Sequence, residues 1–338
     1  MKKWLMYSGV AIVSLILLVT IVGVVYEMLG RSRAAREFPP QGQLVDIGGR
    51  RMQLDCRGTG SPTVIFESGL DINGSLSWSA VHDEIAKTTR ACAYSRAGIM
   101  WSDPKDGPQN AKTVAEDLHA TLVKAGEKPP FVLVGHSLGG PYIMTYTKYF
   151  GADVAGLVFV DASHPDQMQR FKTVTSYTPS SMKMLIKAGV AFAWAGAVRI
   201  APMATKGVTH QPPQAVQAMA AYASTSLGPM LKEFESMDQT FAEAGTFRQL
   251  GNRPLYVLTS TAPLPKEALA TLKLTPEQGV QYKNVWKQMH DEEASWSSKS
   301  QHQLVPDAGH YIQFDRPDIV IEAVRSVVKS VRDMKAAT

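Results

Sequence analysis

Short apolar runs alternate with amphipathic stretches along most of the chain after residue 42. The runs are rich in Val, Ile, Phe and Leu and are bounded by turn-forming residues, a pattern typical of strands. The pattern predicts eight strands, at residues 43–47, 51–56, 63–67, 90–95, 131–136, 155–160, 254–260 and 301–306. Gly48 and Gly49 are expected to turn the first strand into the second.

The amphipathic stretches between these runs repeat apolar residues at helical spacing. They predict helices at about residues 78–88, 111–126, 138–150 and 317–333. The last begins at Pro317 and presents one apolar face, formed by Val320, Ala323, Val324, Val327 and Val331. This alternation predicts the α/β class, with a mostly parallel sheet covered by helices on both faces.

A segment of more than ninety residues separates the strands at 155–160 and 254–260, far more than a crossover connection needs. It is apolar and helix-prone, so we expect an inserted helical cap at about residues 165–250. The cap segment holds seven of the fifteen methionines, namely Met168, Met182, Met184, Met203, Met219, Met230 and Met237. These thioethers either fill gaps in a small helical core or line a substrate pocket.

The N-terminal segment contains 23 consecutive uncharged residues, from Trp4 to Tyr26. A helix of this length spans about 30 Å of hydrocarbon, so the segment predicts a single membrane anchor. We expect the anchor at residues 1–30, a linker at 31–42 and the catalytic domain at 43–338. A cleaved signal, with secretion of the mature chain, is the alternative, but Arg33 interrupts the small residues that a cleavage site would need.

The net charge of +5 and the isoelectric point near 9.0 arise almost wholly at the N-terminus. Residues 1–36 hold five basic groups and one acidic group, which leaves 30 basic and 29 acidic groups in the rest of the chain. A nearly neutral body has no excess of Lys and Arg to cluster against phosphates, so we expect no nucleic-acid partner. Because basic residues stand on both sides of the apolar run, charge alone does not fix its orientation.

The strongest chemical signal is the run Gly135-His136-Ser137-Leu138-Gly139, between a predicted strand and a predicted helix. A serine on a tight strand-to-helix turn has a strained backbone and needs glycine two residues before and after it. Ser137 is therefore the predicted nucleophile. The helix that follows directs its free N–H groups at the same place, which favours an oxyanion and makes Leu138 a predicted donor.

A second oxyanion donor is expected from the loop after the strand at 63–67. Gly69 in this loop allows the backbone to approach the serine closely, and the N–H of Leu70 follows it. The predicted oxyanion hole is thus formed by the N–H groups of Leu70 and Leu138. Gly69 is also expected to border the substrate pocket.

A serine needs a base, and His310 is the predicted one. It follows the last strand, so it lies on a loop at the carboxyl edge of the sheet, where Ser137 also emerges. His136 is adjacent to the nucleophile but is expected to be packed, as a possible pocket residue. His164 follows the strand at 155–160 at the same edge, where it either lines the pocket or has a structural role.

The base in turn needs a carboxylate, and two strand ends could supply it. Asp161 ends the strand at 155–160 and is the predicted acid, with a non-catalytic capping role as its alternative. The strand at 254–260 ends without a carboxylate, and Glu267, several residues further on, is the alternative. Asp307 lies on the same loop as His310 and is expected to be a turn residue.

Together these residues resemble the α/β-hydrolase superfamily, from about Gln43 to the C-terminus apart from the cap. Five runs are similar to those of its exported or membrane-anchored bacterial serine hydrolases, namely residues 56–62, 94–98, 135–140, 160–165 and 309–311. Two positions depart from the usual pattern, since Ser68 stands where a His precedes the glycine and Ser95 where an Asp follows the fourth strand. Neither departure replaces a predicted triad residue.

The resemblance implies the strand order 1-2-4-3-5-6-7-8, which would place Cys56 opposite Cys92. These two cysteines would then form a disulfide, although two isolated thiols also occur as small buried groups. A disulfide would indicate an oxidising compartment, and hence a single-pass protein of the cytoplasmic membrane with its catalytic domain on the extracytoplasmic side.

The sequence as a whole predicts a serine hydrolase that cleaves carboxylic esters with apolar acyl or alcohol groups. An amidase, thioesterase or acyltransferase with the same triad is the alternative, followed by a non-catalytic scaffold that binds a ligand through the cap. No metal-ligand cluster or phosphate-binding loop is evident in the sequence, so no metal or cofactor is expected. The expected partners are a small-molecule ester and the membrane, and the oligomeric state is not indicated.

Overall fold

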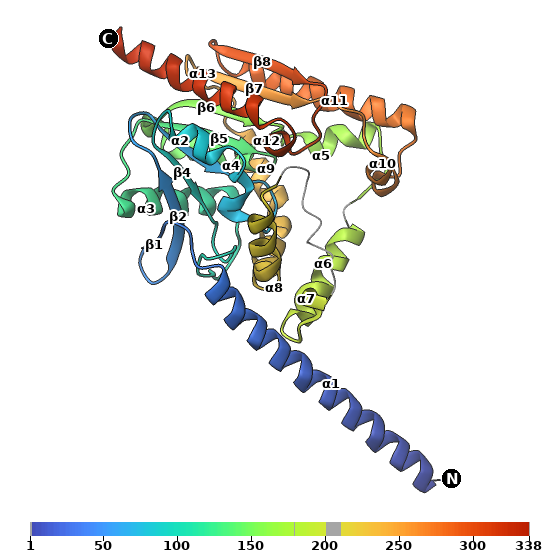
Figure 1. Ribbon diagram of the computed structural model, residues 1–338. Coiled ribbons are helices and arrows are strands. Elements are labelled where there is room, and N and C mark those ends of the chain that lie inside the picture. The colour runs from blue at the N-terminus through green and yellow to red at the C-terminus, as the bar shows by residue number, and fades with distance from the viewer. Residues whose placement is uncertain (1, 179, 201–210, 338) are drawn as a thin grey trace.

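The computed structural model of the protein describes residues 2–178, 180–200 and 211–337. Eight strands form one sheet in the order β1-β2-β4-β3-β5-β6-β7-β8 (Figure 1). The strands are β1 (Gln43–Asp46), β2 (Arg51–Arg57), β3 (Thr63–Glu67), β4 (Ala91–Tyr94), β5 (Phe131–His136), β6 (Val154–Val160), β7 (Leu255–Ser260) and β8 (Ser300–Val305). Each lies within one residue of its predicted bounds.

The sheet is antiparallel at one edge and parallel in the rest. β1 pairs with β2, and β2 with β4, in antiparallel register, whereas all the other neighbours are parallel. Gly48 and Gly49 adopt φ angles of 102° and 89° in the turn from β1 to β2, which glycine adopts without strain. Both the predicted fold class and the predicted strand order are confirmed.

The sheet separates two hydrophobic layers because successive side chains of a strand point to opposite faces. In β5, Phe131 and Leu133 pack in one layer, and Val132 and Val134 in the other. The first layer is closed by α3 (Ala111–Ala125) and α4 (Gly139–Tyr149), and the second by α2 (His82–Ala86), α12 (Ile312–Asp315) and α13 (Pro317–Ala336). The apolar face predicted for the last helix packs in the second layer.

The single helix predicted at residues 78–88 is wrong. A 3-10 turn, η1 (Gly74–Trp78), precedes the short helix α2, and the chain bends between them. Trp78, Val81 and Ile85 are fully buried, so the apolar spacing is real. These side chains are buried from two short elements and the turn between them instead of from one helix. Gly74, with φ of 55°, starts the 3-10 turn, and no side chain caps α2 at Val81.

Two helices between β7 and β8 were not predicted, namely α10 (Lys266–Leu272) and α11 (Pro276–Ser295). The start of α11 carries a recognisable signal. The Thr275 hydroxyl accepts from the N–H of Gln278, the Gln278 side chain accepts from the N–H of Thr275, and Pro276 occupies the first helical position.

The chain between β6 and β7 is largely helical. It contains α5 (Gln167–Arg170), η3 (Phe171–Thr173), α6 (Ser180–Ala193), α7 (Ala197–Ile200), α8 (Pro213–Glu235) and α9 (Met237–Gly245), and we call α6 to α9 the cap helices. Its methionines lie in two kinds of surroundings. Met219 is buried in a small apolar cluster, whereas Met168 and Met237 line a pocket; Met203 lies outside the described residues.

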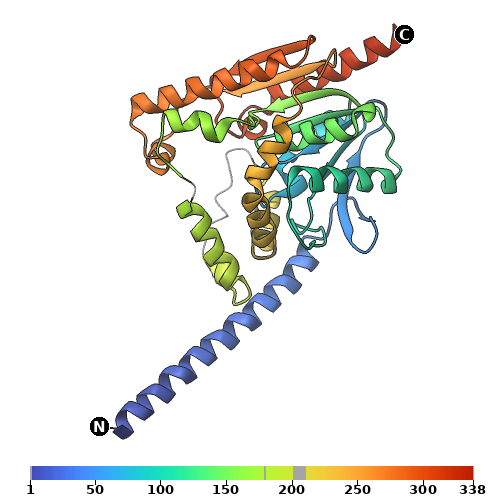
Figure 2. The same cartoon turned by 180° about the vertical axis from the view of Figure 1, so that it is seen from behind.

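The N-terminal helix α1 (Lys2–Glu37) projects from the body in both views (Figures 1 and 2). Its residues from Met6 onward are long and apolar enough to cross a membrane, by length and composition. The helix continues through residues 31–37, which were expected to belong to a linker, and it ends just before Pro39 and Pro40.

Cys56 and Cys92 form a disulfide. They are directly opposite in the register of β2 and β4, as the strand order implied. The bridge therefore joins the antiparallel edge of the sheet to its parallel part.

Candidate active site

Ser137 stands at a sharp turn between β5 and α4, with φ of 53°. The turn has room only for glycine on either side. A Cβ at Gly135 would lie 2.7 Å from the carbonyl carbon of Gly139, and one at Gly139 would lie 2.4 Å from the carbonyl oxygen of Glu67. The backbone N–H of Ser163 donates to the Ser137 carbonyl at 2.8 Å and ties the turn to the end of β6. A serine so placed presents its hydroxyl above the carboxyl edge of the sheet.

Asp161 follows β6 at this edge and is almost fully buried. Its Oδ1 accepts from the Ser260 N–H at 2.8 Å and from Trp286 Nε1 at 2.9 Å. Its Oδ2 accepts from the Ser260 hydroxyl at 2.9 Å and from His310 Nδ1 at 2.7 Å. Burial alone would raise the pKa of this carboxyl, but the His310 hydrogen bond and nearby positive charge hold the pKa well below its usual value. The site therefore presents an ionised carboxylate.

His310 lies on the loop between β8 and α12, and its side chain is 42% exposed. The bond from Nδ1–H to Asp161 fixes the tautomer and leaves Nε2 as the basic nitrogen. Nε2–H of His136 donates to the His310 carbonyl at 2.9 Å and holds the loop from the other side. Ser137 and His310 are not hydrogen-bonded to each other in this structure, and such a bond commonly tightens only when substrate binds.

The loop after β3 approaches the serine closely. A Cβ at Gly69 would lie 2.9 Å from Ser137 Cβ, so the position requires glycine. The N–H groups of Leu70 and Leu138 donate to no other group among the described residues. Ser137, Gly69, Leu70 and Leu138 thus lie together at this turn, and their role in binding an oxyanion stays a prediction.

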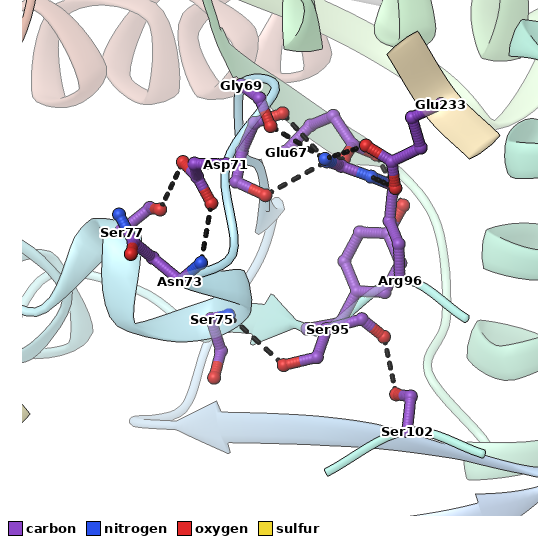
Figure 3. A network of polar contacts seen from close by, with 12 residues as sticks. Glu67, Gly69, Asp71, Asn73, Ser75, Ser77, Ser95, Arg96, Ser102 and Glu233 are labelled. Carbon is purple, nitrogen blue, oxygen red and sulfur yellow. Dashed lines mark hydrogen bonds and ion pairs between the residues drawn. The ribbon is translucent and has the colours of Figure 1, made fainter. Parts of the chain in front are cut away.

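Arg96 fixes this loop from below (Figure 3). Its guanidinium donates to Glu67 Oε1 at 2.7 Å, to the Ser68 carbonyl at 2.8 Å and to the Gly69 carbonyl at 2.6 Å. It also forms a two-pronged pair with Glu233 of α8, at 2.8 and 2.7 Å. A fully buried arginine therefore ties the loop of Gly69 to a cap helix.

Burial dominates the electrostatics of this cluster. Burial raises the pKa of the Glu67 carboxyl to about 7, and Arg96 only partly opposes it. The guanidinium also lies 5.0 Å from the centre of the Tyr142 ring, on α4. The pairing of Arg96 with Glu233 is not predictable from the sequence, because the two residues are 137 positions apart and no local pattern relates them.

Helix α11 supplies the other residues that sequence reasoning missed. Trp286 donates to Asp161, and Lys283 Nζ donates to the carbonyl and the hydroxyl of Ser260 at 2.9 Å each. His290 is buried, and its Nε2–H donates to the Ala162 carbonyl at 2.8 Å. Burial lowers the pKa of His290 to about 4. The unpredicted helix therefore forms one wall around the carboxylate.

The two other candidate histidines have different surroundings. His136 lies under the site, with its ring centre 4.7 Å from that of His310, and burial lowers its pKa to about 3. His164 packs on Trp296 at 5.5 Å and accepts from the Asp166 N–H at 3.1 Å. None of its hydrogen bonds, ion pairs or ring contacts within the described chain reaches Ser137, Asp161 or His310.

His164, Asp166 and Glu292 lie close enough together to share a metal ion. Their carboxylates are already paired, since Arg248 donates to Asp166 at 2.8 Å and to Glu292 at 2.9 Å. Arg170 also pairs with Glu292. Two guanidinium groups at the same carboxylates favour a structural cluster over cation binding.

An apolar pocket of about 460 Å³ lies between α5, η3, α10 and α11. Met168, Phe171, Met237 and Tyr282 contribute to its lining. Met168 and Met237 also pack in the cluster that contains Leu70 and Leu138. The pocket is therefore connected by contact to the residues around the turn of Ser137.

Proteins from a bacterium and a yeast match parts of this chain. The chain is 26% identical to YbdG of Bacillus subtilis over 164 residues, which cover 48% of this chain and 50% of that protein. It is 32% identical over 108 residues to YNL115C of Saccharomyces cerevisiae, which is named a vacuolar membrane protein, covering 31% of this chain and 17% of that protein. The chain thus spans half or less of these two relatives.

The fold is shared with solved hydrolases. An esterase from Thermogutta terrifontis superposes with a TM-score of 0.61 at 17% identity, covering 86% of this chain and 98% of the esterase. The model of the alpha/beta hydrolase family matches residues 54–323, so this chain belongs to that family.

Proposed function

We propose that the protein is a serine hydrolase that cleaves carboxylic esters with Ser137 as nucleophile, His310 as base and Asp161 as the orienting acid. The observation that carries the proposal is the 2.7 Å hydrogen bond from His310 Nδ1 to a buried, ionised Asp161, at the sheet edge where Ser137 turns outward. Membership in a family of hydrolases and the likeness to an esterase support it.

In the proposed mechanism, Ser137 Oγ attacks the carbonyl carbon of the ester while its proton passes to His310 Nε2. The N–H groups of Leu70 and Leu138 bind the oxyanion that forms. The C–O bond then breaks, and the departing alcohol takes the proton from His310. Water attacks the acyl-enzyme, gives its proton to His310, and the acid leaves as Ser137 recovers its proton.

Asp161 serves this cycle without changing its own protonation state. Its carboxylate holds His310 in the tautomer whose Nε2 accepts a proton, and it stabilises the imidazolium that results. Its other donors, Ser260 and Trp286, keep the carboxylate oriented. The chemistry uses no group beyond the protein and water.

The preferred substrates are proposed to carry apolar acyl or alcohol groups. The pocket of about 460 Å³ is lined largely by apolar and aromatic side chains, including Met168 and Met237 near the oxyanion residues. Burial of each methylene in such a pocket contributes about 0.8 kcal/mol. Esters of longer chain are therefore expected to have lower KM.

We further propose that α1 anchors the protein in the cytoplasmic membrane, with residues 43–338 as an extracytoplasmic catalytic domain. The apolar length of α1 and the disulfide support this arrangement, because disulfides persist in oxidising compartments. Alkaline phosphatase fused after the last residue should be active in intact bacterial cells. Inactivity of this fusion, with activity of a matched cytoplasmic reporter, would contradict the orientation.

Hydrolysis of matched substrates tests the reaction itself. We expect wild-type protein to hydrolyse an aryl ester with an acyl chain much faster than the corresponding anilide, and Ser137→Ala to lose about a millionfold in kcat. Ser163→Ala is the control. This substitution removes a neighbouring hydroxyl but keeps the backbone N–H of Ser163 that supports the same turn, so the rate should stay near that of wild type. Faster anilide hydrolysis would favour an amidase instead.

A further inference from the structure

Large apolar side chains are exposed at the end of the cap nearest α1. We define the cap tip as residues 192–200, which comprise the end of α6, the following turn and α7. Phe192 is 60% exposed, Trp194 51% and Ile200 71%. Exposed apolar side chains grouped in this way mark a surface that another apolar phase covers.

The charged residues of α6 do not interrupt the apolar character of this surface. Lys187 pairs with Glu235 of α8 at 2.8 Å, and Lys183 lies 4.0 Å from the same carboxylate. Both lysines are thus engaged on the side of α6 that faces α8. Met184 and Leu185 continue the exposed apolar surface along α6, at 73% and 53% exposure.

The cap tip is joined to α1 by a buried ionic contact. Glu27 of α1 is only 2% exposed and accepts from Arg199 Nε of the cap tip at 2.7 Å. It also accepts from the Ser224 hydroxyl of α8 at 2.7 Å. A buried charge that is paired with two other elements holds the three elements in one arrangement. The position of the cap tip along the axis of α1 is therefore fixed at Glu27.

Glycines bring the tip still closer, on the membrane side of Glu27. A Cβ at Gly23 would lie 2.5 Å from the carbonyl oxygen of Ala195, and one at Gly196 would lie 3.0 Å from the Tyr26 ring. Gly23 belongs to the uncharged run that ends at Tyr26. At about 1.5 Å per residue, the turn of the cap tip lies about 6 Å further into that run than Glu27.

We propose that the cap tip is a lipid-binding surface that inserts into the interfacial layer of the bilayer crossed by α1. This inference rests on the proposed anchor. If the uncharged run of α1 spans the hydrocarbon, its last turn lies at the boundary between acyl chains and headgroups, and the tip lies beside that turn. Interfacial segments insert about 5–10 Å into this boundary, and tryptophan is enriched there.

Basic residues stand at the appropriate level for phospholipid headgroups. Arg33 and Arg36 are exposed on α1, on the polar side of Glu27; Arg33 pairs with Glu37 at 2.8 Å, and Arg36 has no acidic partner among the ion pairs of the described residues. Exposed basic residues near the membrane surface are attracted to anionic headgroups. The patch therefore combines an apolar tip with a positive rim, which fits an anionic bilayer better than the surface of a second protein.

Single-cysteine labelling of the full chain tests the proposal, because Cys56 and Cys92 are occupied by their disulfide. The Phe192→Cys variant is labelled with an environment-sensitive fluorophore. It is then reconstituted into vesicles of phosphatidylcholine and phosphatidylglycerol that contain nitroxide lipids, which quench the fluorophore. Val280→Cys, on α11, is the matched exposed control at 62%, and α11 lies away from α7 in both views. Leu15→Cys, in the middle of α1, reports on the anchor.

We expect lipid nitroxides to quench the probe at position 192 at least about twofold more than the probe at 280, with the shallow quencher more effective than the deep one. Strong quenching at position 15 together with equal, weak quenching at 192 and 280 would overturn the proposal and leave the anchor intact. Absence of quenching at position 15 as well would overturn both. Retained hydrolysis of a short aryl ester shows that each labelled variant is folded.

Discussion

Asp161 combines burial with ionisation because four donors surround its two oxygens. Its position after β6 could be predicted from the sequence, because a strand ending in a carboxylate at the carboxyl edge is a local pattern. Its donors Trp286 and Ser260 could not, since they come from segments about 100 residues or more away. The carboxylate at this position could thus be predicted from the sequence, but the hydrogen-bond donors that keep it charged could not.

Asp161→Asn should lower kcat about ten-thousandfold, because an amide no longer selects the tautomer of His310 or stabilises the imidazolium. Glu267→Gln, the other predicted acid, is the matched control, because Glu267 stands in the first turn of α10 and has no hydrogen bond to His310. Steady-state kinetics on one aryl ester compares the two. A large loss in Glu267→Gln with a near-normal Asp161→Asn would reverse the assignment.

His290 should make the stability of the protein depend on pH. Burial lowers its pKa to about 4, whereas the unfolded chain binds a proton near pH 6.5. Its contribution to the free energy of unfolding is therefore present above pH 6.5 and is lost as the pH falls toward 4. The difference in unfolding free energy between wild type and His290→Gln should shrink over this range by up to about 3 kcal/mol.

Denaturant unfolding at several pH values in the same detergent measures this difference. His302→Gln is a control with a half-buried histidine on β8, for which the change should be smaller. A difference for His290→Gln that stays constant from pH 6.5 to 4 would mean that the side chain is solvated in the folded protein.

At the scale of elements, strands were predicted more accurately than helices. Strict alternation of apolar residues toward two layers specifies a strand almost to the residue, as β5 shows. Helix α11 was missed because its buried positions are few and its composition is polar, although the Thr275 to Gln278 capping box marked its start. The contact between α8 and the loop after β3 had no local signal, because it depends on tertiary pairing.

Arg96 is predicted to be a positioning residue for the oxyanion hole. Arg96→Lys should lower kcat at least about tenfold with little change in KM, since an ammonium group cannot hold Glu67, Gly69 and Glu233 together. Each kcat is calculated per folded molecule, and the folded fraction is taken from the unfolding transition of the same variant. Arg57→Lys, at a partly exposed arginine of β2, is the matched control and should retain kcat. If the role of Arg96 were purely structural, Arg96→Lys would lower the stability of the protein and leave kcat of the folded fraction unchanged.

At the scale of the whole molecule, the positive charge belongs to one end. The basic excess flanks the apolar run of α1, while the folded body is nearly neutral. The same end holds the exposed apolar cap tip, joined to α1 through Glu27 and Arg199. Charge and apolar exposure thus coincide where the molecule is proposed to meet the bilayer, and the candidate active site lies at the carboxyl edge of the sheet.

Loss of the disulfide should destabilise the whole domain. Cys56 and Cys92 are separated by 36 positions, and closing a loop of that size in the unfolded chain contributes about 3–4 kcal/mol of stability. The double variant Cys56→Ser with Cys92→Ser should therefore unfold at a lower denaturant concentration than oxidised wild type, and reduced wild type should behave in the same way. An unchanged midpoint in both would show that the bridge adds nothing to stability.

Ser137 is proposed to carry the acyl group, and covalent labelling with a fluorophosphonate tests this assignment without any assumption about the substrate. We expect one adduct per chain, located by peptide mass spectrometry on the segment that contains Ser137, with adduct formation in Ser163→Ala and none in Ser137→Ala. A wild-type protein that remains unlabelled, or an adduct that persists in Ser137→Ala, would contradict it.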